Sequence, residues 1–406
     1  MTTSTRHETA QLHPAGGLVR RPTAGFAWAN DLPRYDFGPG HPMAPIRLEL
    51  TRELVRWLRI PGLVDVPVPD VPDELLELVH DPAFVAAVQA GAVGIRSAEF
   101  GLGTDDNPVF PEIHTASSRI VGSTVAAARS VWTGQVPRAV SIAGGMHHAM
   151  PARASGFCVY NDVGVAIRWL LDNGARRVAY VDLDAHHGDG VERIFWDDPR
   201  VLTISVHESG LTLFPGTGFP YETGGPGAEG LAVNVALPAR TRGDAWLRAI
   251  DAVVPPLVEE FAPDVLVSQH GADAHGSDPL TNLRVSVDHQ LAGARMMRDL
   301  ADRFAAGRWV ATGGGGYTVV EVVPRVWAGL AAVAAGLDPD LGQRLPLRWR
   351  LDVSERGLPA PLMWGDGETV TLRPFSAGYD PADDVDRAIV ATRHAVFPHR
   401  GLDPGW

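Results

Sequence analysis

Several short apolar runs in this chain end in a small polar motif, and this repeated arrangement constrains the fold more than any other feature. One run leads into Asp-Leu-Asp-Ala-His-His-Gly-Asp-Gly at 182–190, and another into Gly-Gly-Met-His-His at 144–148. Two more end in Gln-His-Gly-Ala-Asp at 269–273 and Gly-Gly-Gly-Gly-Tyr at 313–317. Such runs are typical of strands buried on both faces of a parallel sheet. Because ligands bind at the carboxyl ends of these strands, we expect the motifs to meet in one site.

Strand-like and helix-like segments alternate along most of the chain, which predicts an open, mostly parallel, doubly wound α/β sheet with helices on both faces. The predicted strands are 138–145, 177–185, 201–207, 231–237, 264–270 and 309–313. The predicted helices are 41–58, 74–90, 117–132, 161–173, 243–262 and 286–306, with a short amphipathic stretch at 381–396. We expect a flexible tail at 1–20, a single catalytic domain at 21–335, and a C-terminal extension at 336–406 packed on it.

Charge and composition exclude several classes of partner. The net charge of −13 argues against nucleic acid, because phosphate binding needs clustered positive charge. No apolar run reaches the roughly 18 residues that a membrane helix needs, and the N-terminus lacks the apolar stretch of a signal peptide. The single cysteine, Cys158, excludes intramolecular disulfides and fits a reducing compartment. We therefore expect a cytoplasmic protein that binds neither nucleic acid nor membrane.

Asp184 and His186 predict a metal site, because residues two apart on a strand end point to the same face. Asp273, after another predicted strand, is the candidate third ligand. Three protein ligands with an open position are typical of catalytic Zn²⁺, although nitrogen and oxygen ligands also suit Fe²⁺ or Co²⁺. An isolated Asp-x-His pair more often caps a strand end. Here Asp182 and Asp189 crowd the same turn, and burying so many ionisable groups without a cation is costly.

Two adjacent histidines are candidates for general acid–base chemistry. His147 and His148 follow two glycines, which allow the backbone to approach a ligand closely. Each imidazole needs a carboxylate on its far nitrogen to fix its tautomer, and Asp182 and Asp189 can supply one each. A histidine pair alone is more often a hydrogen-bonded loop feature, but beside a metal motif it indicates proton transfer.

Three aromatic residues complete the predicted site. Tyr317 follows four glycines, so its phenol could reach a substrate carbonyl and stabilise an oxyanion. The glycines could instead cradle a phosphate, but no Gly-Lys-Ser/Thr ending or ribose-binding acid follows them. Phe157 and Phe214 lie in loops after strand ends, where two facing rings could wall a narrow slot for a tetramethylene chain. Core packing is the equally weighted alternative for both rings.

With these motifs in this order, the chain resembles the zinc-dependent histone deacetylase family, class I in type. The resemblance extends from about Phe37 to Val333 and includes Gly144–His148, Ala154–Asp162, Tyr180–Glu192, Phe214–Gly218 and Gly313–Tyr317. It implies an arginase/deacetylase-like fold and zinc-dependent hydrolysis of acetyl-lysine in proteins, with release of acetate. Bacterial members imply a setting in acetoin or acetate metabolism, with acetyl-CoA synthetase as a candidate substrate. An acetylpolyamine amidohydrolase is the alternative, followed by a non-catalytic binding module on the same scaffold.

The resemblance also implies a role for each site residue. One Zn²⁺ per subunit would be bound by Asp184, His186 and Asp273. The catalytic residues would be His148 with Asp189, His147 with Asp182, and Tyr317. The substrate-binding residues would be Asp105, Gly156, Phe157, Phe214 and Gly315. A K⁺ or Na⁺ ion would be held at Asp182, Asp184, His186, Ser205 and Val206. An acetate channel would be lined by Arg47 and Cys158.

Arginases share the implied fold but hold two manganese ions. This chain has Gly188 and His275 where the carboxylates for the second ion would fall. We therefore expect one catalytic metal ion rather than two.

Overall fold

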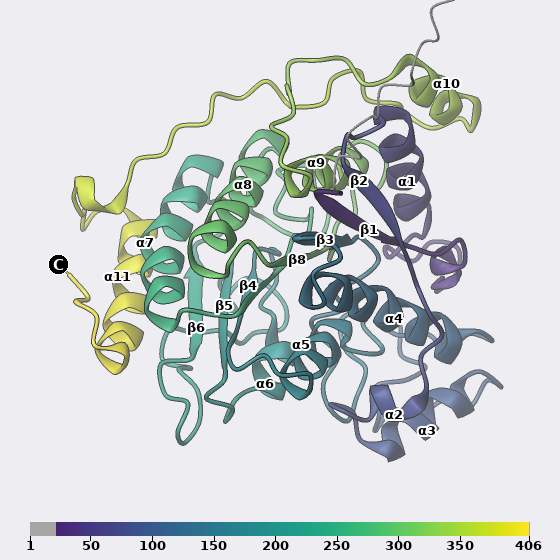
Figure 1. Cartoon of the computed structure of the whole chain (residues 1–406), viewed down its shortest axis with the longest axis horizontal. Helices are drawn as coiled ribbons and strands as arrows, with labels where there is room; N and C mark the ends of the chain where they lie inside the picture. Colours follow the sequence, from purple (N-terminus) through teal and green to yellow (C-terminus); the bar gives the residue numbers. More distant parts are fainter. Residues whose placement is uncertain (1–21, 406) are drawn as a thin grey trace, which may run out of the picture.

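The structure is a computed structural model that describes residues 22–405, and its centre is one eight-stranded sheet (Figure 1). The strand order is β2-β1-β3-β8-β7-β4-β5-β6, and every neighbouring pair is parallel. The strands are β1 (Ala24–Trp28), β2 (Leu63–Pro67), β3 (Arg138–Ser141), β4 (Val178–Asp182), β5 (Val201–Glu208), β6 (Ala232–Leu237), β7 (Val265–Gln269) and β8 (Trp309–Thr312). The predicted parallel α/β fold is confirmed.

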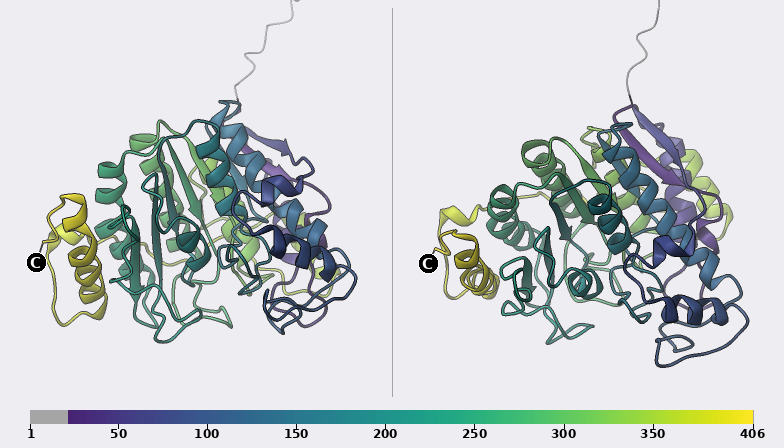
Figure 2. Two further views of the ribbon diagram at one scale, coloured as in Figure 1. Left: turned by 90° about the horizontal axis from the view of Figure 1, so that it is seen from below. Right: turned by 60° about the horizontal axis from the view of Figure 1, so that its bottom comes forward.

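Helices cover both faces of this sheet (Figures 1 and 2). One layer contains α1 (Ile46–Leu58), α7 (Gly243–Phe261), α8 (Val287–Phe304) and α9 (Val323–Ala334), which pack side by side. The other contains α3 (Pro82–Gly91), α4 (Ile113–Trp132), α5 (Asp162–Asp172) and α6 (Asp189–Ile194). Within residues 22–405, no helix combines the length and apolarity needed to cross a bilayer.

The register of the central strands brings the polar motifs to one edge of the sheet. Ser141 of β3 pairs with Thr312 of β8, Thr312 with Gln269 of β7, and Gln269 with Asp182 of β4. Each of these residues is the last of its strand, so the four strands end side by side at the same level. The loops that follow all emerge at this edge and carry the motifs noted in the sequence.

Some elements differ from those predicted, mainly where a proline sets the start of a helix and at the edge of the sheet formed by β1 and β2. The expected helix at 74–90 is two helices, α2 (Asp73–Leu76) and α3, because proline at the start of α3 cannot continue a preceding helix. Helix α1 begins at Ile46, after Pro45, rather than at residue 41. Strands β1 and β2 and helix α9 were not predicted. The strand expected at 138–145 ends at Ser141, before the glycines at 144 and 145.

The C-terminal segment packs on two separate parts of the main domain. Its helix α10 (Leu347–Glu355) packs on α1, where the Trp349 Nε1 donates a hydrogen bond to the Leu50 carbonyl at 3.0 Å. Its last helix, α11 (Asp384–Val396), lies against β6 and α7, and the buried Asp386 accepts from the Arg248 Nε at 2.6 Å. The division at residue 335 stays a prediction, and the tail expected at 1–20 lies outside the described residues.

Candidate metal centre

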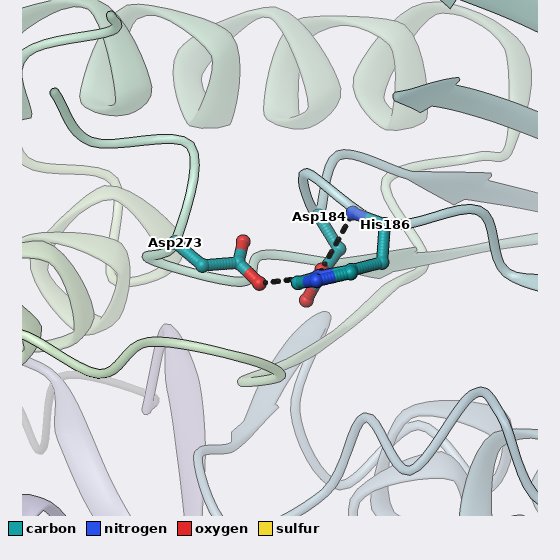
Figure 3. Close-up of side chains that lie close together, drawn as sticks. All are labelled: Asp184, His186 and Asp273. Carbon is teal, nitrogen blue, oxygen red and sulfur yellow. Dashed lines mark hydrogen bonds and ion pairs between the residues drawn. The ribbon is translucent and has the colours of Figure 1, made fainter. Parts of the chain in front are cut away.

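Three buried side chains meet at the carboxyl ends of β4 and β7. Asp184, His186 and Asp273 each offer one ligand atom, and these atoms all lie within 4.8 Å of one another. Figure 3 shows Asp273 approaching from its own loop toward the side chains of Asp184 and His186. The His186 Nδ1 lies 3.1 Å from the Asp184 Oδ1 and 3.0 Å from the Asp273 Oδ2. Two carboxylate oxygens and one imidazole nitrogen thus surround a common point.

Hydrogen-bond donors hold these carboxylates in place. The Asp184 Oδ2 accepts from the Gly315 backbone N–H at 2.8 Å and from the Gln269 Nε2 at 2.7 Å. The Asp273 Oδ1 accepts from the Ala185 N–H at 2.9 Å. A Cβ atom at Gly315 would lie 2.1 Å from the Asp273 Oδ2, so only glycine fits there. These contacts orient the ligand oxygens toward His186, which is the usual role of partners around a metal ligand.

The charge of the cluster fits a bound cation. Burial and the charge of Asp184 raise the pKa of Asp273 to about 8. Burial acts to lower the pKa of His186, but hydrogen bonds to Asp184 and Asp273 outweigh it and raise that pKa to about 10. Two facing carboxylates in a buried place are costly without positive charge between them. A divalent cation supplies that charge, and one nitrogen with two oxygens suits Zn²⁺, Fe²⁺ or Co²⁺.

The two adjacent histidines each contact a different carboxylate beside this cluster. The His147 Nδ1 lies 2.7 Å from the Asp182 Oδ2, and the His148 Nδ1 lies 2.6 Å from the Asp189 Oδ1. The imidazole centroids of His147 and His148 are 4.1 Å apart, so both rings belong to one site. In both histidines the carboxylate is hydrogen-bonded to Nδ1, so Nε2 is the nitrogen that can contact a substrate or water.

The environments of these histidines push their pKa values apart. Burial acts to lower the pKa of His147, but the charges of Asp182 and Asp184 outweigh it and raise that pKa to about 9. Burial and the positive charge of His147 lower the pKa of His148 to about 4. At neutral pH, His147 is therefore protonated and His148 is neutral. A pair of titratable groups tuned in opposite directions is the arrangement expected of an acid–base site.

A cavity of about 210 Å³ leads to this cluster, and it is lined by Asp106, His148, Gly156, Phe157, His186, Leu213, Phe214, Leu280 and Tyr317. Aromatic rings form much of its wall. The Phe157 ring lies 5.7 Å from the Tyr317 ring, and the Phe214 ring lies 5.0 Å from the His148 ring. A Cβ atom at Gly156 would lie 2.5 Å from the His148 ring, so glycine is required beside it. The cavity is lined by both apolar and polar side chains and includes His186 of the cluster in its wall.

Tyr317 is held in this wall by its backbone as well as by its ring. Its N–H donates to the Asp278 Oδ2 at 2.8 Å. Burial and the charges of Asp273 and Asp184 keep the pKa of Tyr317 well above its ordinary value, so the phenol stays protonated. A protonated phenol in the wall of the cavity can donate a hydrogen bond to a bound ligand.

At the mouth of the cavity, the structure places Asp106 rather than the expected Asp105 in the wall. The sequence pattern does not determine which of two adjacent aspartates in a loop faces the cavity. The Asp106 carbonyl lies 3.3 Å from the His41 Nε2, and the His41 ring lies 4.7 Å from the Phe157 ring. Leu213 and Leu280 also line the cavity and were not predicted, because single leucines in loops carry no distinguishing signal.

The remaining predicted residues lie around the cluster. Arg47 is buried and donates to the Gly314 carbonyl at 2.8 Å, and Cys158 is buried with its Sγ 3.3 Å from the Gly156 carbonyl. Ser205 and Val206 are buried in β5, where the Ser205 Oγ accepts from the Gly188 N–H at 3.3 Å. The acetate channel and the monovalent-cation site assigned to these residues stay predictions.

The chain is similar to a known protein family, to proteins of known name and to a solved structure. Residues 41–334 match the histone deacetylase domain. The acetoin utilization protein AcuC of Bacillus subtilis (strain 168) is 39% identical over 347 residues, which cover 84% of this chain and 89% of that protein. AcuC of Staphylococcus xylosus is 36% identical over 332 residues, covering 80% and 86%. A crystal structure of an HDAC homolog complexed with SAHA superposes with a TM-score of 0.77 at 25% identity, covering 92% of this chain and 100% of that one.

Proposed function

Because the chain belongs to the histone deacetylase domain family, whose members hydrolyse acetyl amides, we propose that its substrate is acetyl-lysine in proteins. The observation that carries this proposal is the cavity. Its aromatic walls at Phe157 and Phe214 lead directly to His148 and His186. An acetyl-lysine side chain presents a slender apolar stem with one amide at its end, which matches a cavity that has aromatic walls and polar groups at the cluster.

Asp184, His186 and Asp273 would hold the catalytic ion, which we propose to be Zn²⁺. When bound, the ion supplies a Lewis acid that polarises the acetyl carbonyl and makes water more acidic. One ion is expected, because His275 and Gly188 supply no carboxylate for a second. The same residues could accept Fe²⁺ or Co²⁺, since their nitrogen and oxygen donors do not discriminate strongly.

His148 is the proposed proton acceptor. It is neutral at pH 7, because its pKa is about 4, and its Nδ1 is held by Asp189, so its Nε2 can take a proton from the attacking water. Water adds to the carbonyl carbon, and the resulting tetrahedral species collapses as protonated His148 gives its proton to the leaving lysine amine. The products are acetate and free lysine.

Tyr317 and His147 stabilise the negative charge that forms during this step. The protonated Tyr317 phenol, in the wall of the cavity, donates a hydrogen bond to the oxygen of the former carbonyl. His147 is held by Asp182 through its Nδ1 and lies directly beside His148, where it supports the same charge electrostatically. Asp106 is the carboxylate at the mouth that we assign to the backbone of a peptide substrate.

The named relatives suggest the biological setting. Both are acetoin utilization proteins, so we propose a cytoplasmic role in acetoin or acetate metabolism with acetyl-CoA synthetase as a candidate substrate. The test is to incubate acetylated acetyl-CoA synthetase with the protein and follow acetyl-lysine by mass spectrometry. This chain contains no lysine, so every acetyl-lysine signal comes from the substrate. Loss of the acetyl group without a released acetate, or no loss at all, would contradict the proposal.

The net charge of −13 favours a second candidate, an acetylpolyamine amidohydrolase, because a cationic amine is attracted to an acidic protein. The two candidates differ in kcat/KM for acetylspermidine and for an acetyl-lysine peptide measured on the same preparation. A ratio that favours the peptide by tenfold or more supports the protein deacetylase. A ratio that favours acetylspermidine selects the alternative.

A further inference from the structure

The C-terminal segment places one carboxylate, Asp366, against the loop that follows Asp273 and against the first turns of α8 and α9. Asp366 lies outside residues 41–334, which match the histone deacetylase domain. Its Oδ2 lies 3.0 Å from the His275 Nε2 and accepts from the Val287 N–H at 2.8 Å. Its Oδ1 accepts from an Arg325 guanidinium N–H at 2.8 Å. One carboxylate from a distant part of the chain therefore joins three segments of the main domain.

The hydrogen bonds define how His275 uses its two nitrogens. The Ser277 backbone N–H lies 3.1 Å from the His275 Nδ1 and can only donate, so Nδ1 is an acceptor. The Nε2 then carries the hydrogen and donates to the Asp366 carboxylate. The Ser277 Oγ also lies 2.8 Å from Nδ1. His275 thus links Asp366 to the backbone and side chain of Ser277.

The segment that contains His275 also carries residues of the active site. Asp273, a proposed metal ligand, lies two residues before it, and Asp278, which accepts from the Tyr317 N–H, lies three residues after it. The Thr318 Oγ1 donates to the Ser277 carbonyl at 2.9 Å, directly beside Tyr317. A displacement of the segment 273–278 would therefore move both Asp273 and the backbone of Tyr317.

The other carboxylate oxygen of Asp366 contacts the helix that follows the tyrosine loop, which is the loop between β8 and α9 that carries Tyr317. Arg325 lies in the first turn of α9, where the loop that carries Tyr317 ends. Its guanidinium contacts Asp366 and also donates to the Trp364 carbonyl at 3.1 Å, while the Trp364 Nε1 donates to the Arg325 carbonyl at 3.1 Å. Both Arg325 and Trp364 are buried. The contact between this C-terminal segment and α9 is therefore reciprocal and fixed at two points.

We propose that Asp366 is a positioning residue of the deacetylase reaction, which fixes the phenol of Tyr317 relative to the metal ligand Asp273. Through His275 it holds the segment 273–278, which contacts the loop that carries Tyr317, and through Arg325 it holds the helix after that loop. This inference rests on the proposed function, because it assigns Asp366 to the geometry of that reaction. It gives the C-terminal extension a part in catalysis, although none of its described residues, 336–405, lines the cavity.

The variant D366N keeps the size of the side chain and removes its charge. Its amide offers one acceptor oxygen in place of two, so the contacts to His275 and to Arg325 cannot both be kept. A misplacement of catalytic groups by about 1 Å can lower a rate by about a hundredfold. We expect D366N to lower kcat about tenfold and to change KM less than about twofold, because the walls of the cavity are untouched.

A double-mutant cycle tests whether this effect acts through Tyr317. The variants D366N, Y317F and D366N/Y317F are compared with the wild type on an acetyl-lysine peptide under saturating zinc. If Asp366 positions the phenol, D366N lowers kcat about tenfold with Tyr317 present and less than twofold in the Y317F background. An equal fall in both backgrounds, or no fall in either, overturns the inference.

Two controls separate this result from loss of folding and from failure of the proposed function. Asp386 lies in the same extension, and the variant D386N breaks its buried contact with Arg248 of α7, away from the loop that carries Tyr317. This variant should lower thermal stability while leaving kcat unchanged below the melting transition. If D366N does not fold, H275A breaks the same connection from its other end and replaces it in the cycle. An inactive wild type would contradict the deacetylase function itself, whereas an active wild type with an additive cycle contradicts only the role of Asp366.

Discussion

At the scale of single residues, Tyr317 has the most specific proposed role. Its phenol lines the cavity and stays protonated, so its replacement by phenylalanine removes one hydrogen-bond donor and little else. We expect Y317F to lower kcat by about 10²–10³ with KM nearly unchanged, as for the loss of one oxyanion donor. Steady-state kinetics on an acetyl-lysine peptide measure both constants. An unchanged kcat would remove the phenol from the reaction.

The contact between His148 and Asp189 predicts a change in the pH profile. His148 must be neutral to accept a proton, and its pKa of about 4 means that kcat/KM falls only as the pH drops toward that value. Asp189 acts to raise this pKa, so D189N should move the acid limb to still lower pH. It should also lower kcat, because the imidazole loses the partner that fixes its tautomer. A shift of the acid limb to higher pH would contradict this assignment.

Much of the site was predictable because its chemistry is concentrated in short motifs. Asp184 and His186 stand two apart at a strand end, so their convergence follows from strand geometry. Asp105 was predicted to hold the backbone of a peptide substrate, and this role stays a prediction, although Asp106 rather than Asp105 lines the cavity. A one-residue register in a loop is decided by tertiary contacts, such as those of His41, and not by a local pattern.

At the scale of helices and strands, the six strands from β3 to β6 in the sheet order were recognisable, and β1 and β2, at the opposite edge, were not. Strands β4 and β7 are fully buried apolar runs, which give the strong signal of a parallel strand. Strand β2, at the edge, has the sequence Leu-Val-Asp-Val-Pro and is mostly exposed or half-buried, so its pattern resembles a loop. Helix α9 is apolar on nearly all sides because other helices and the sheet surround it, and it therefore lacks a helical period of polar residues.

Helix α11 depends on one buried ion pair. Arg248 of α7 and Asp386 of α11 are 5% and 0% exposed and are joined by two hydrogen bonds. Removal of one partner leaves a buried charge unpaired, which destabilises a protein by about 3–5 kcal/mol. We expect D386N to lower the free energy of unfolding by an amount in that range, measured by denaturant titration. A change below about 1 kcal/mol would mean that water or other groups compensate for the lost carboxylate.

At the scale of the whole molecule, metal binding and stability should be coupled through pH. Without metal, the pKa values of His147 and His186 lie at about 9 and about 10, above the ordinary value of 6.5. A histidine whose pKa is raised on folding contributes stability that is full below pH 6.5 and is lost as the pH rises through the raised value. The metal-free protein should therefore become less stable as the pH rises above 6.5.

Zinc should offset this loss, because metal binding releases the protons that His186 and Asp273 otherwise hold. The shift in Tm caused by zinc should therefore be larger at pH 8.5 than at pH 6.5. A free metal concentration one thousand times the Kd stabilises the folded state by about 4 kcal/mol. Differential scanning fluorimetry with and without a chelator measures both shifts. Equal shifts at the two pH values would mean that the ion does not displace these protons.

The position of the metal ion in the protein is the most direct test. A crystal of the zinc-loaded protein, measured on both sides of the zinc absorption edge, locates the ion independently of any assumed ligand. We expect one anomalous peak about 2.0–2.2 Å from the His186 Nδ1 and from carboxylate oxygens of Asp184 and Asp273. A peak elsewhere, or ligation that omits any of these three side chains, would contradict the proposed centre.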